Sequence, residues 1–341
     1  MQSILLDTIN GIKGERPPVW FMRQAGRVLP NYNKLKEKYS FREMMADPAI
    51  AADVTLMPVS DLGVDAAILF SDILVIPSAM GMALKWTDRG PVFPTPLSQY
   101  DKPVDHLSVN PDDLNYIYDV IDEILRKRGE NIPLIGFSGA PLTTLAYMLQ
   151  GISSDQNFPA AVKFMFQNKA ETLRLIDAVV ELTIIYAKNQ IAHGIEVFQL
   201  FETHAGLIPT EMYCEMFLPA VQRISEAVRN TGTPFIYFPK GFSTGLKYVT
   251  PDLCDFVSID WQMPLYHARK LVHPEVGLQG NVDPRLLYAS PAMIESELEK
   301  LKPFFSDNDK WILNLGHGFL PDTPFDHAKF VVDWVNNTGW G

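Results

Sequence analysis

The feature that most constrains the fold of this chain is the alternation of short, β-rich runs with longer stretches of helical spacing. The eight runs are 18–22, 66–70, 133–137, 195–201, 234–238, 255–259, 276–280 and 311–315. Repeated strand–helix units of this kind build parallel sheets with crossover helices. Eight such units close naturally into a barrel. The sequence therefore predicts the α/β class and a single (β/α)8 TIM-type barrel.

An open, doubly wound sheet is the alternative arrangement of the same units. Dinucleotide-binding sheets of that type carry a glycine-rich turn after the first strand. Here residues 22–27 read Met-Arg-Gln-Ala-Gly-Arg, which disfavours this alternative. No internal repeat or flexible linker divides the chain, and its longest irregular stretch is 86–109. We therefore expect one domain over residues 1–341.

Helices are expected between the runs because apolar side chains recur there three or four residues apart. The clearest stripe consists of Leu173, Ile176, Val180, Ile184 and Ala187. It predicts a long helix with this face against the sheet. The pairs Ser290-Pro291 and Thr323-Pro324 predict two helix starts, with proline at the first helical position.

Composition limits the cellular setting and the partners. The 341 residues are 47% hydrophobic and 20% charged, which is an ordinary balance for a compact globular protein. We find no secretory signal and no apolar span long enough for a membrane. The two cysteines, Cys214 and Cys254, favour a reducing cytoplasm, although one bridge between them stays open. The net charge of −11 argues against nucleic-acid binding, which needs a basic surface.

Polar and ionisable side chains follow nearly every run. They are Arg23, Arg27, Asp72, Ser138 with Tyr147 nearby, Glu202, Thr203, Lys240, Asp260, Asn281 and His317. In a parallel barrel the carboxyl ends of the strands meet at one face, where the loops assemble the active site. Each residue alone is as easily a structural charge, but the shared trend predicts a site at this face.

Three of these residues have a specific chemistry. Arg23 and Arg27 lie four residues apart, and paired guanidinium groups suit bidentate binding of carboxylates or phosphates. The alternative is an ion-pair network with the acidic side chains of Glu37, Glu43 or Asp47. A carboxylate at Asp72, at the rim of a buried strand, needs a cationic or N–H partner. That partner is a ligand or, alternatively, the first turn of a helix from Ile73 onward.

Other reaction classes lack their motifs. No His-x-Cys, Cys-x-x-Cys or His-Glu-x-x-His arrangement is present, so we expect no metal site. Gly316-His317-Gly318 alone is too short to indicate a phosphate loop. Ser138, within Gly-Phe-Ser-Gly at 136–139, does not match a hydrolase nucleophile turn.

Five segments carry a resemblance to a known family. They read Pro-Val-Trp-Phe-Met-Arg-Gln-Ala-Gly-Arg at 18–27, Phe-Ser-Asp-Ile-Leu at 70–74, Gly-Phe-Ser-Gly-Ala-Pro at 136–141, Leu-Gln-Gly-Asn-Val-Asp-Pro at 278–284 and Leu-Gly-His-Gly at 315–318. In this order they resemble the uroporphyrinogen decarboxylases over nearly the whole chain. The resemblance implies a barrel, a homodimer, no cofactor, and conversion of uroporphyrinogen III to coproporphyrinogen III by removal of four acetate carboxyl groups.

The same resemblance implies roles for single residues. Arg23 and Arg27 would hold substrate carboxylates and assist proton transfer, and Asp72 would accept hydrogen bonds from the pyrrole N–H groups. The catalytic set would be Asp72, Arg27, Arg23 and Tyr147, and the substrate-binding set would be Arg23, Gln24, Ala25, Arg27, Asp72, Tyr147, Thr203 and His317. The chain departs from the family at Leu142, where an aromatic residue is usual, and at Thr203, where serine is usual.

Two alternative functions remain at this point. A zinc-dependent methyltransferase of the same fold would need a His-x-Cys pair, but Met212 and Asp252 stand two residues before Cys214 and Cys254. A non-catalytic tetrapyrrole-binding protein would keep the cleft without turnover. The arginine pair and Asp72 disfavour it.

Overall fold

A parallel sheet forms the centre of the molecule. The computed structural model describes residues 3–87, 90–151 and 157–340. Seven strands follow one another in the order β1-β4-β5-β6-β7-β8-β9, and all neighbours are parallel. Their bounds are β1 (Ala67–Ile68), β4 (Leu134–Gly139), β5 (Val197–Glu202), β6 (Phe235–Pro239), β7 (Phe256–Ser258), β8 (Gly277–Gln279) and β9 (Trp311–Ile312). The predicted α/β class is confirmed.

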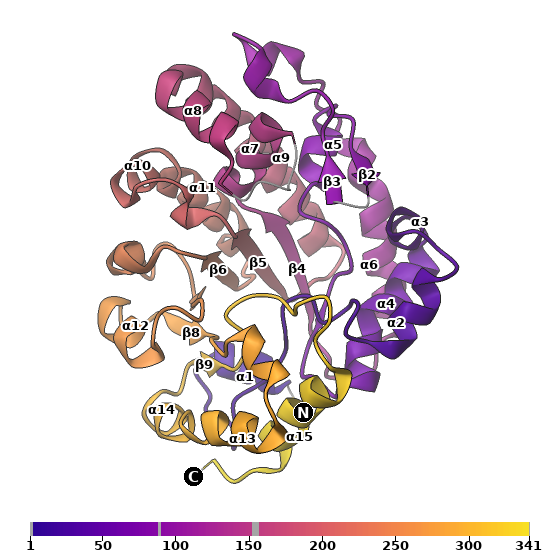
Figure 1. Ribbon diagram of the computed structural model, residues 1–341, viewed down its shortest axis with the longest axis vertical. Helices are drawn as coiled ribbons and strands as arrows, with labels where there is room; N and C mark the ends of the chain where they lie inside the picture. Colours follow the sequence, from indigo (N-terminus) through magenta and orange to yellow (C-terminus); the bar gives the residue numbers. More distant parts are fainter. Residues whose placement is uncertain (1–2, 88–89, 152–156, 341) are drawn as a thin grey trace.

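Helices surround this sheet, as Figure 1 shows. The α-helices are α1 (Ile4–Ile9), α2 (Pro30–Lys36), α3 (Phe41–Ala46), α4 (Pro48–Asp61), α5 (Val75–Ala79), α6 (Asn115–Lys127), α7 (Pro141–Gln150), α8 (Pro159–Gln167), α9 (Lys169–Ala192), α10 (Thr210–Met216), α11 (Leu218–Arg229), α12 (Leu265–Leu271), α13 (Pro291–Glu299), α14 (Lys302–Asp307) and α15 (Phe325–Asn337). Short 3-10 helices are η1 (Leu97–Gln99), η2 (Pro103–His106), η3 (Pro111–Leu114), η4 (Ala205–Leu207), η5 (Ser243–Tyr248) and η6 (Pro284–Tyr288).

The strands form where the chain is apolar on both faces. Every residue of β4, β6, β7 and β8 is buried, as expected for parallel strands covered by helices. Seven of the eight predicted runs overlap one of these strands. Because all strands of the sheet are parallel, their carboxyl ends lie at one edge. Ser138 and Glu202 lie at the ends of β4 and β5, and Tyr147 lies on α7. The loops after the strands carry the other polar side chains, Asp72, Thr203, Lys240, Asp260, Asn281 and His317.

The first predicted run, 18–22, is not a strand. It makes one isolated parallel bridge, between Val19 and Leu313, and the carbonyl of Val19 accepts a hydrogen bond of 2.8 Å from Asp65 N. The ladder stops because Asn314 intervenes: its Oδ1 accepts from Met22 N at 3.2 Å and from Leu315 N at 2.8 Å. The same side chain explains why the run 311–315 gives only the short strand β9.

Three helical and loop predictions need correction. The stretch 86–109 is not wholly irregular, because β2 (Lys85–Thr87) and β3 (Gly90–Val92) pair as an antiparallel hairpin. In α9, Ile176, Val180 and Ala187 are buried as predicted, but Leu173 is 38% exposed and Ile184 is half-buried. Helix α13 begins at Pro291 as predicted, whereas α15 begins one residue later than expected, after Pro324.

Candidate active site

Arg23 is the residue around which the predicted site assembles. Its φ of 61° lies in the left-handed region that residues other than glycine seldom adopt. Its side chain fits because position 318 is glycine: a Cβ atom there would collide with Cγ and Cδ of Arg23. Burial is the main cause of a shifted pKa at four groups, and the charge of Arg23 contributes at each: Asp72, Tyr147, Lys240 and His317.

Asp72 lies between β1 and α5. Its Oδ1 accepts a hydrogen bond of 2.7 Å from Leu74 N, so the capping role left open by the sequence is present, although α5 begins at Val75 rather than Ile73. No described residue donates a hydrogen bond to Oδ2. Burial raises the pKa of Asp72, while the Leu74 N–H and the charge of Arg23 oppose the rise. One carboxylate oxygen therefore remains for a donor on a ligand.

Two tyrosines lie close to this carboxylate. Burial raises the pKa of Tyr147, and the charge of Asp72 adds to the rise. Burial, followed by Asp72, also raises the pKa of Tyr116 to about 12. Both phenols therefore remain protonated at neutral pH and can donate a proton in a hydrogen bond. Tyr116 was not predicted, because a single tyrosine in a helical pattern looks the same as a core residue.

The other side of the site carries histidine and lysine. Burial, with smaller contributions from Arg23, Lys240 and His204, lowers the pKa of His317 to about 3. Burial, with help from Lys240, lowers the pKa of His204 to about 4. Both imidazoles are therefore neutral at pH 7. The Nζ atom of Lys240 lies 5.6 Å from the ring centroid of Trp261.

Thr203 lies on the wall of a cavity of about 690 Å³. The cavity is lined by Asn157, Pro159, Val162, Lys163, Thr203, His204, Gly206, Leu207, Lys240 and Gly241. His204, next to Thr203 in the chain, was missed by the sequence interpretation. The only available signal was the order of a strand followed by Glu-Thr-His, which does not say which of these side chains faces a ligand.

The three remaining predicted residues, Gln24, Ala25 and Arg27, differ in burial and in hydrogen bonding. Gln24 is fully buried, and its amide is occupied: Oε1 accepts from Phe21 N at 2.9 Å, and Nε2 donates to Ala66 O at 2.9 Å. Ala25 is half-buried and Arg27 is exposed. Gln24 therefore holds the turn that carries Arg23 and Arg27, with its side chain directed into protein.

The ion-pair alternative for the two arginines does not form among the described residues. Glu43 instead completes a capping box with Ser40 at the start of α3. Asp47 accepts hydrogen bonds from the first amides of α4. The guanidinium groups of Arg23 and Arg27 thus have no carboxylate bound within hydrogen-bond distance in the described chain.

Other polar residues at the strand ends have structural contacts. Glu202 is fully buried and binds the start of α7, and Asn281 Nδ2 donates to the carbonyl of Asp260 at 2.9 Å. Asp260 accepts from Gly241 N at 2.7 Å and from Gln262 N at 2.9 Å. The hydroxyl of Ser138 is buried without a partner in the described chain.

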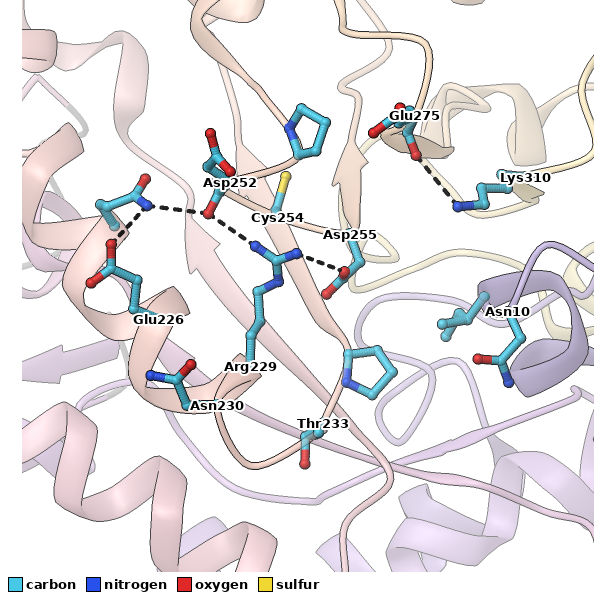
Figure 2. A pocket seen from close by; sticks show the side chains of 15 residues that line it. Asn10, Glu226, Arg229, Asn230, Thr233, Asp252, Cys254, Asp255, Glu275 and Lys310 are labelled. Atoms are coloured by element: carbon cyan, nitrogen blue, oxygen red, sulfur yellow. Dashed lines mark hydrogen bonds and ion pairs between the residues drawn. The ribbon is translucent and has the colours of Figure 1, made fainter.

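A larger cavity, of about 950 Å³, lies at the opposite ends of the strands. Figure 2 shows that both cations of this cavity, Arg229 and Lys310, are bound by carboxylate or backbone oxygens. Arg229 donates to Asp252 O at 2.9 Å and lies 3.3 Å from Asp255 Oδ1, and Lys310 Nζ lies 3.4 Å from Glu275 O. This cavity stands at the amino ends of β6 to β9, away from Arg23 and Asp72.

Within the described part of the chain, no group of three or more His, Cys, Asp or Glu side chains is placed to hold a metal ion. Cys214 is half-buried, Cys254 is buried, and both are free thiols. Of the helices described, none is long and apolar enough to cross a membrane.

Comparison with known structures shows the fold. A methyltransferase from Methanosarcina mazei superposes with a TM-score of 0.81 at 18% identity, covering 98% of this chain and 99% of that protein. A B12-independent methionine synthase from Shewanella sp. W3-18-1 gives a TM-score of 0.57 at 12% identity, covering 88% and 90%. At these identities the likeness concerns architecture alone.

Sequence comparison is more specific. The chain is 38% identical to a uroporphyrinogen decarboxylase from Christiangramia forsetii over 337 residues, 98% of this chain and 97% of that protein. It is 37% identical to a uroporphyrinogen decarboxylase from Pelobacter propionicus, with 98% of each chain covered. Residues 2–338 match the family model described as uroporphyrinogen decarboxylase. The chain therefore belongs to the uroporphyrinogen decarboxylase family.

Proposed function

We propose that this protein is a carboxy-lyase of tetrapyrrole biosynthesis that converts uroporphyrinogen III to coproporphyrinogen III. It would remove the carboxyl groups of the four acetate side chains as CO2 and leave methyl groups. The observation that carries the proposal is the placement of Asp72, with one free carboxylate oxygen, beside Arg23 and Tyr147. Family membership over nearly the whole chain supports the same assignment.

The chemistry needs an electron sink that the substrate itself provides. Protonation of a pyrrole at its α-carbon makes a cationic ring. The C–C bond to the carboxylate then breaks, its electron pair moves into the ring, and CO2 leaves. The exocyclic carbon takes up a proton, and the ring carbon loses the one it gained. Each acetate decarboxylation therefore consumes one proton overall.

The residues have matching roles. Asp72 Oδ2 would accept hydrogen bonds from the pyrrole N–H groups and stabilise the cationic ring electrostatically. Arg23 and Arg27 would bind substrate carboxylates. Tyr147, Thr203 and the neutral His317 would donate hydrogen bonds around the ring, and Gln24 and Ala25 would shape the turn that bears the arginines. We propose no cofactor and no metal.

The remaining proposals concern the whole protein. We propose that residues 18–22 close the sheet between β9 and β1 into a (β/α)8 barrel within one domain, which the Val19 contacts to Leu313 and Asp65 support. We further propose a homodimer and a cytoplasmic location, the latter supported by two free thiols. Nucleic-acid binding is not proposed, because the net charge is −11.

Anaerobic incubation with uroporphyrinogen III, followed by oxidation and chromatography of the porphyrins, tests the activity. We expect products with successively fewer carboxyl groups, ending at coproporphyrin, and unchanged turnover after exhaustive chelation. Binding of uroporphyrinogen without any product would instead identify a tetrapyrrole carrier. Turnover that is lost on chelation and restored by zinc would point to metal-dependent chemistry.

A further inference from the structure

The cavity of about 690 Å³ beside Thr203 has an unusual charge for this protein. The chain has a net charge of −11. Yet no Asp or Glu occurs among the described residues that line this cavity, and two lysines do, Lys163 and Lys240. A cavity with this lining favours an anion, because no carboxylate of a described lining residue neutralises either lysine.

Lys240 is the half-buried cation of the pair. It forms no ion pair with a described residue. The nearest candidate, Asp260, is occupied, since its two oxygens accept from Gly241 N at 2.7 Å and Gln262 N at 2.9 Å. Burial lowers the pKa of Lys240, Asp260 opposes this, and the positive charge of Arg23 adds to the lowering. An ammonium group in such surroundings is stabilised by a bound anion.

The other described polar groups of the cavity cannot supply positive charge. His204 is neutral at pH 7, because burial and Lys240 lower its pKa to about 4. Its backbone N–H donates to Thr143 Oγ1 at 3.1 Å. The first amides of α8, at Ala160 and Ala161, already donate to Gln150 Oε1 at 2.9 and 3.4 Å. Among the described lining residues, the two lysines are therefore the only source of positive charge, and Thr203 and His204 can add hydrogen bonds.

We propose that this cavity binds a propionate carboxylate of the substrate, one that does not react, through Lys240 with Lys163 at the rim. The inference rests on the proposed function. The lining does not include Arg23, Asp72 or Tyr147. The cavity adjoins them, because the His204 ring on its wall lies 5.8 Å from the Tyr147 ring and Arg23 contributes to the shifted pKa of Lys240. A carboxylate held here is therefore bound by groups other than those assigned to the reacting acetate. A group bound equally before and during the reaction contributes to affinity rather than to the rate of the chemical step.

The test compares Lys240→Gln, Lys240→Arg and Lys163→Gln with wild type. Lys188→Gln is the matched control, because Lys188 is exposed on α9 and does not line the cavity. Coproporphyrinogen III is the main probe, since it carries propionates and no acetates. Its affinity is read from the fluorescence of the protein, with Trp261 lying against Lys240 as a local reporter.

For Lys240→Gln we expect the Kd for coproporphyrinogen III and the KM for uroporphyrinogen III to rise together, each by about tenfold or more, which is the usual effect of losing one charged hydrogen bond. The fall in kcat should be smaller. Lys163→Gln should act in the same direction with a smaller effect, because its side chain is exposed. Lys240→Arg should recover part of the affinity.

Three results would overturn the proposal. The first is a coproporphyrinogen Kd within about twofold of wild type in Lys240→Gln. The second is weaker binding of uroporphyrinogen alone, which would place an acetate in the cavity. The third is an equal loss in Lys188→Gln, which would show general attraction by surface charge. Binding of coproporphyrinogen is measured without turnover. An inactive wild-type protein would therefore refute the proposed function, and the binding data would still decide whether the cavity holds a propionate.

Discussion

The two carboxylate oxygens of Asp72 differ in their hydrogen bonding. Oδ1 is bound by Leu74 N, whereas Oδ2 has no donor in the described chain. This division allows the charge and the capping contact to be separated experimentally. Asparagine keeps an oxygen acceptor for Leu74 and removes the charge that would stabilise a protonated pyrrole.

For Asp72→Asn we expect kcat to fall by about 10²-fold or more, with a smaller loss of product affinity, because the charge acts mainly in the transition state. The thermal midpoint should stay close to that of wild type. Steady-state kinetics and thermal unfolding of the same preparation measure both. Undiminished turnover in the folded variant would remove Asp72 from the mechanism.

Arg27 differs from Arg23 in its surroundings. Like Arg23, it is exposed and has no ion pair in the described chain, but unlike Arg23 it does not contribute to the shifted pKa of Asp72, Tyr147 or His317. The proposed role therefore depends on a substrate carboxylate that reaches it.

We expect Arg27→Lys to lower kcat/KM by about tenfold, because lysine cannot make the planar, two-pronged contact to a carboxylate. Stability should not change, since no described ion pair is lost. Arg223→Lys, on the outer surface beside Asp177, is the control and should behave as wild type. Wild-type kinetics in Arg27→Lys would assign Arg27 to the solvated surface.

At the scale of elements, Glu202 joins β5 to α7. Its Oε1 accepts from Thr143 N at 2.6 Å and from Thr143 Oγ1 at 2.5 Å, and its Oε2 accepts from Leu142 N at 3.1 Å and from Tyr213 at 3.2 Å. The strand end that leads to Thr203 is thereby fixed to the helix that carries Tyr147. Despite these donors, burial raises the pKa of Glu202 to about 7.

This raised pKa predicts a pH-dependent stability. Between the ordinary value of 4.5 and about 7, the folded state binds a proton that the unfolded state releases. The free energy of unfolding should therefore decrease as pH rises through this window, by up to roughly 3 kcal/mol. Glutamine at position 202 does not titrate. The difference in the free energy of unfolding between wild type and Glu202→Gln should therefore shift against wild type by that amount as the pH rises through this window.

Urea unfolding at several pH values between 4.5 and 8 measures this effect. Glu211→Gln, at an exposed position on α10, is the control for replacing a surface carboxylate by an amide. A difference between Glu202→Gln and wild type that does not vary with pH would contradict the prediction.

Periodicity predicted the sheet well because parallel strands covered on both faces must be apolar throughout. Periodicity wrongly predicted a strand at 18–22, where one side chain interrupts the ladder. Asn314 Oδ1 accepts the hydrogen bond from Met22 N, so the run makes a single bridge. For the site, motif order pointed to Arg23 and Asp72, which the structure places together. Tyr116 and His204 were missed because their positions depend on how α6 and the loop after β5 fold toward Asp72 and Lys240.

For the whole molecule we expect a homodimer, on the basis of the family. Sedimentation over a dilution series should give a species of twice the 38.4 kDa chain mass at micromolar concentration. The series should be run with and without coproporphyrinogen III, because ligand binding shifts assembly when it favours one state. A single 38.4 kDa species in every sample would count against the dimer.

The contact of Met22 and Arg23 with Gly318 and Phe319 also predicts when the protein can become active during its synthesis. Phe319 N donates to Met22 O at 3.1 Å, and Gly318 makes the space that Arg23 fills. Ribosome-bound chains stalled before residue 310 should therefore not bind coproporphyrinogen III, whereas chains that carry residues 1–341 followed by a C-terminal extension should. Asp72 and Tyr147 are synthesised well before Gly318 and Phe319, so Arg23 is held beside them only after these later residues have been made.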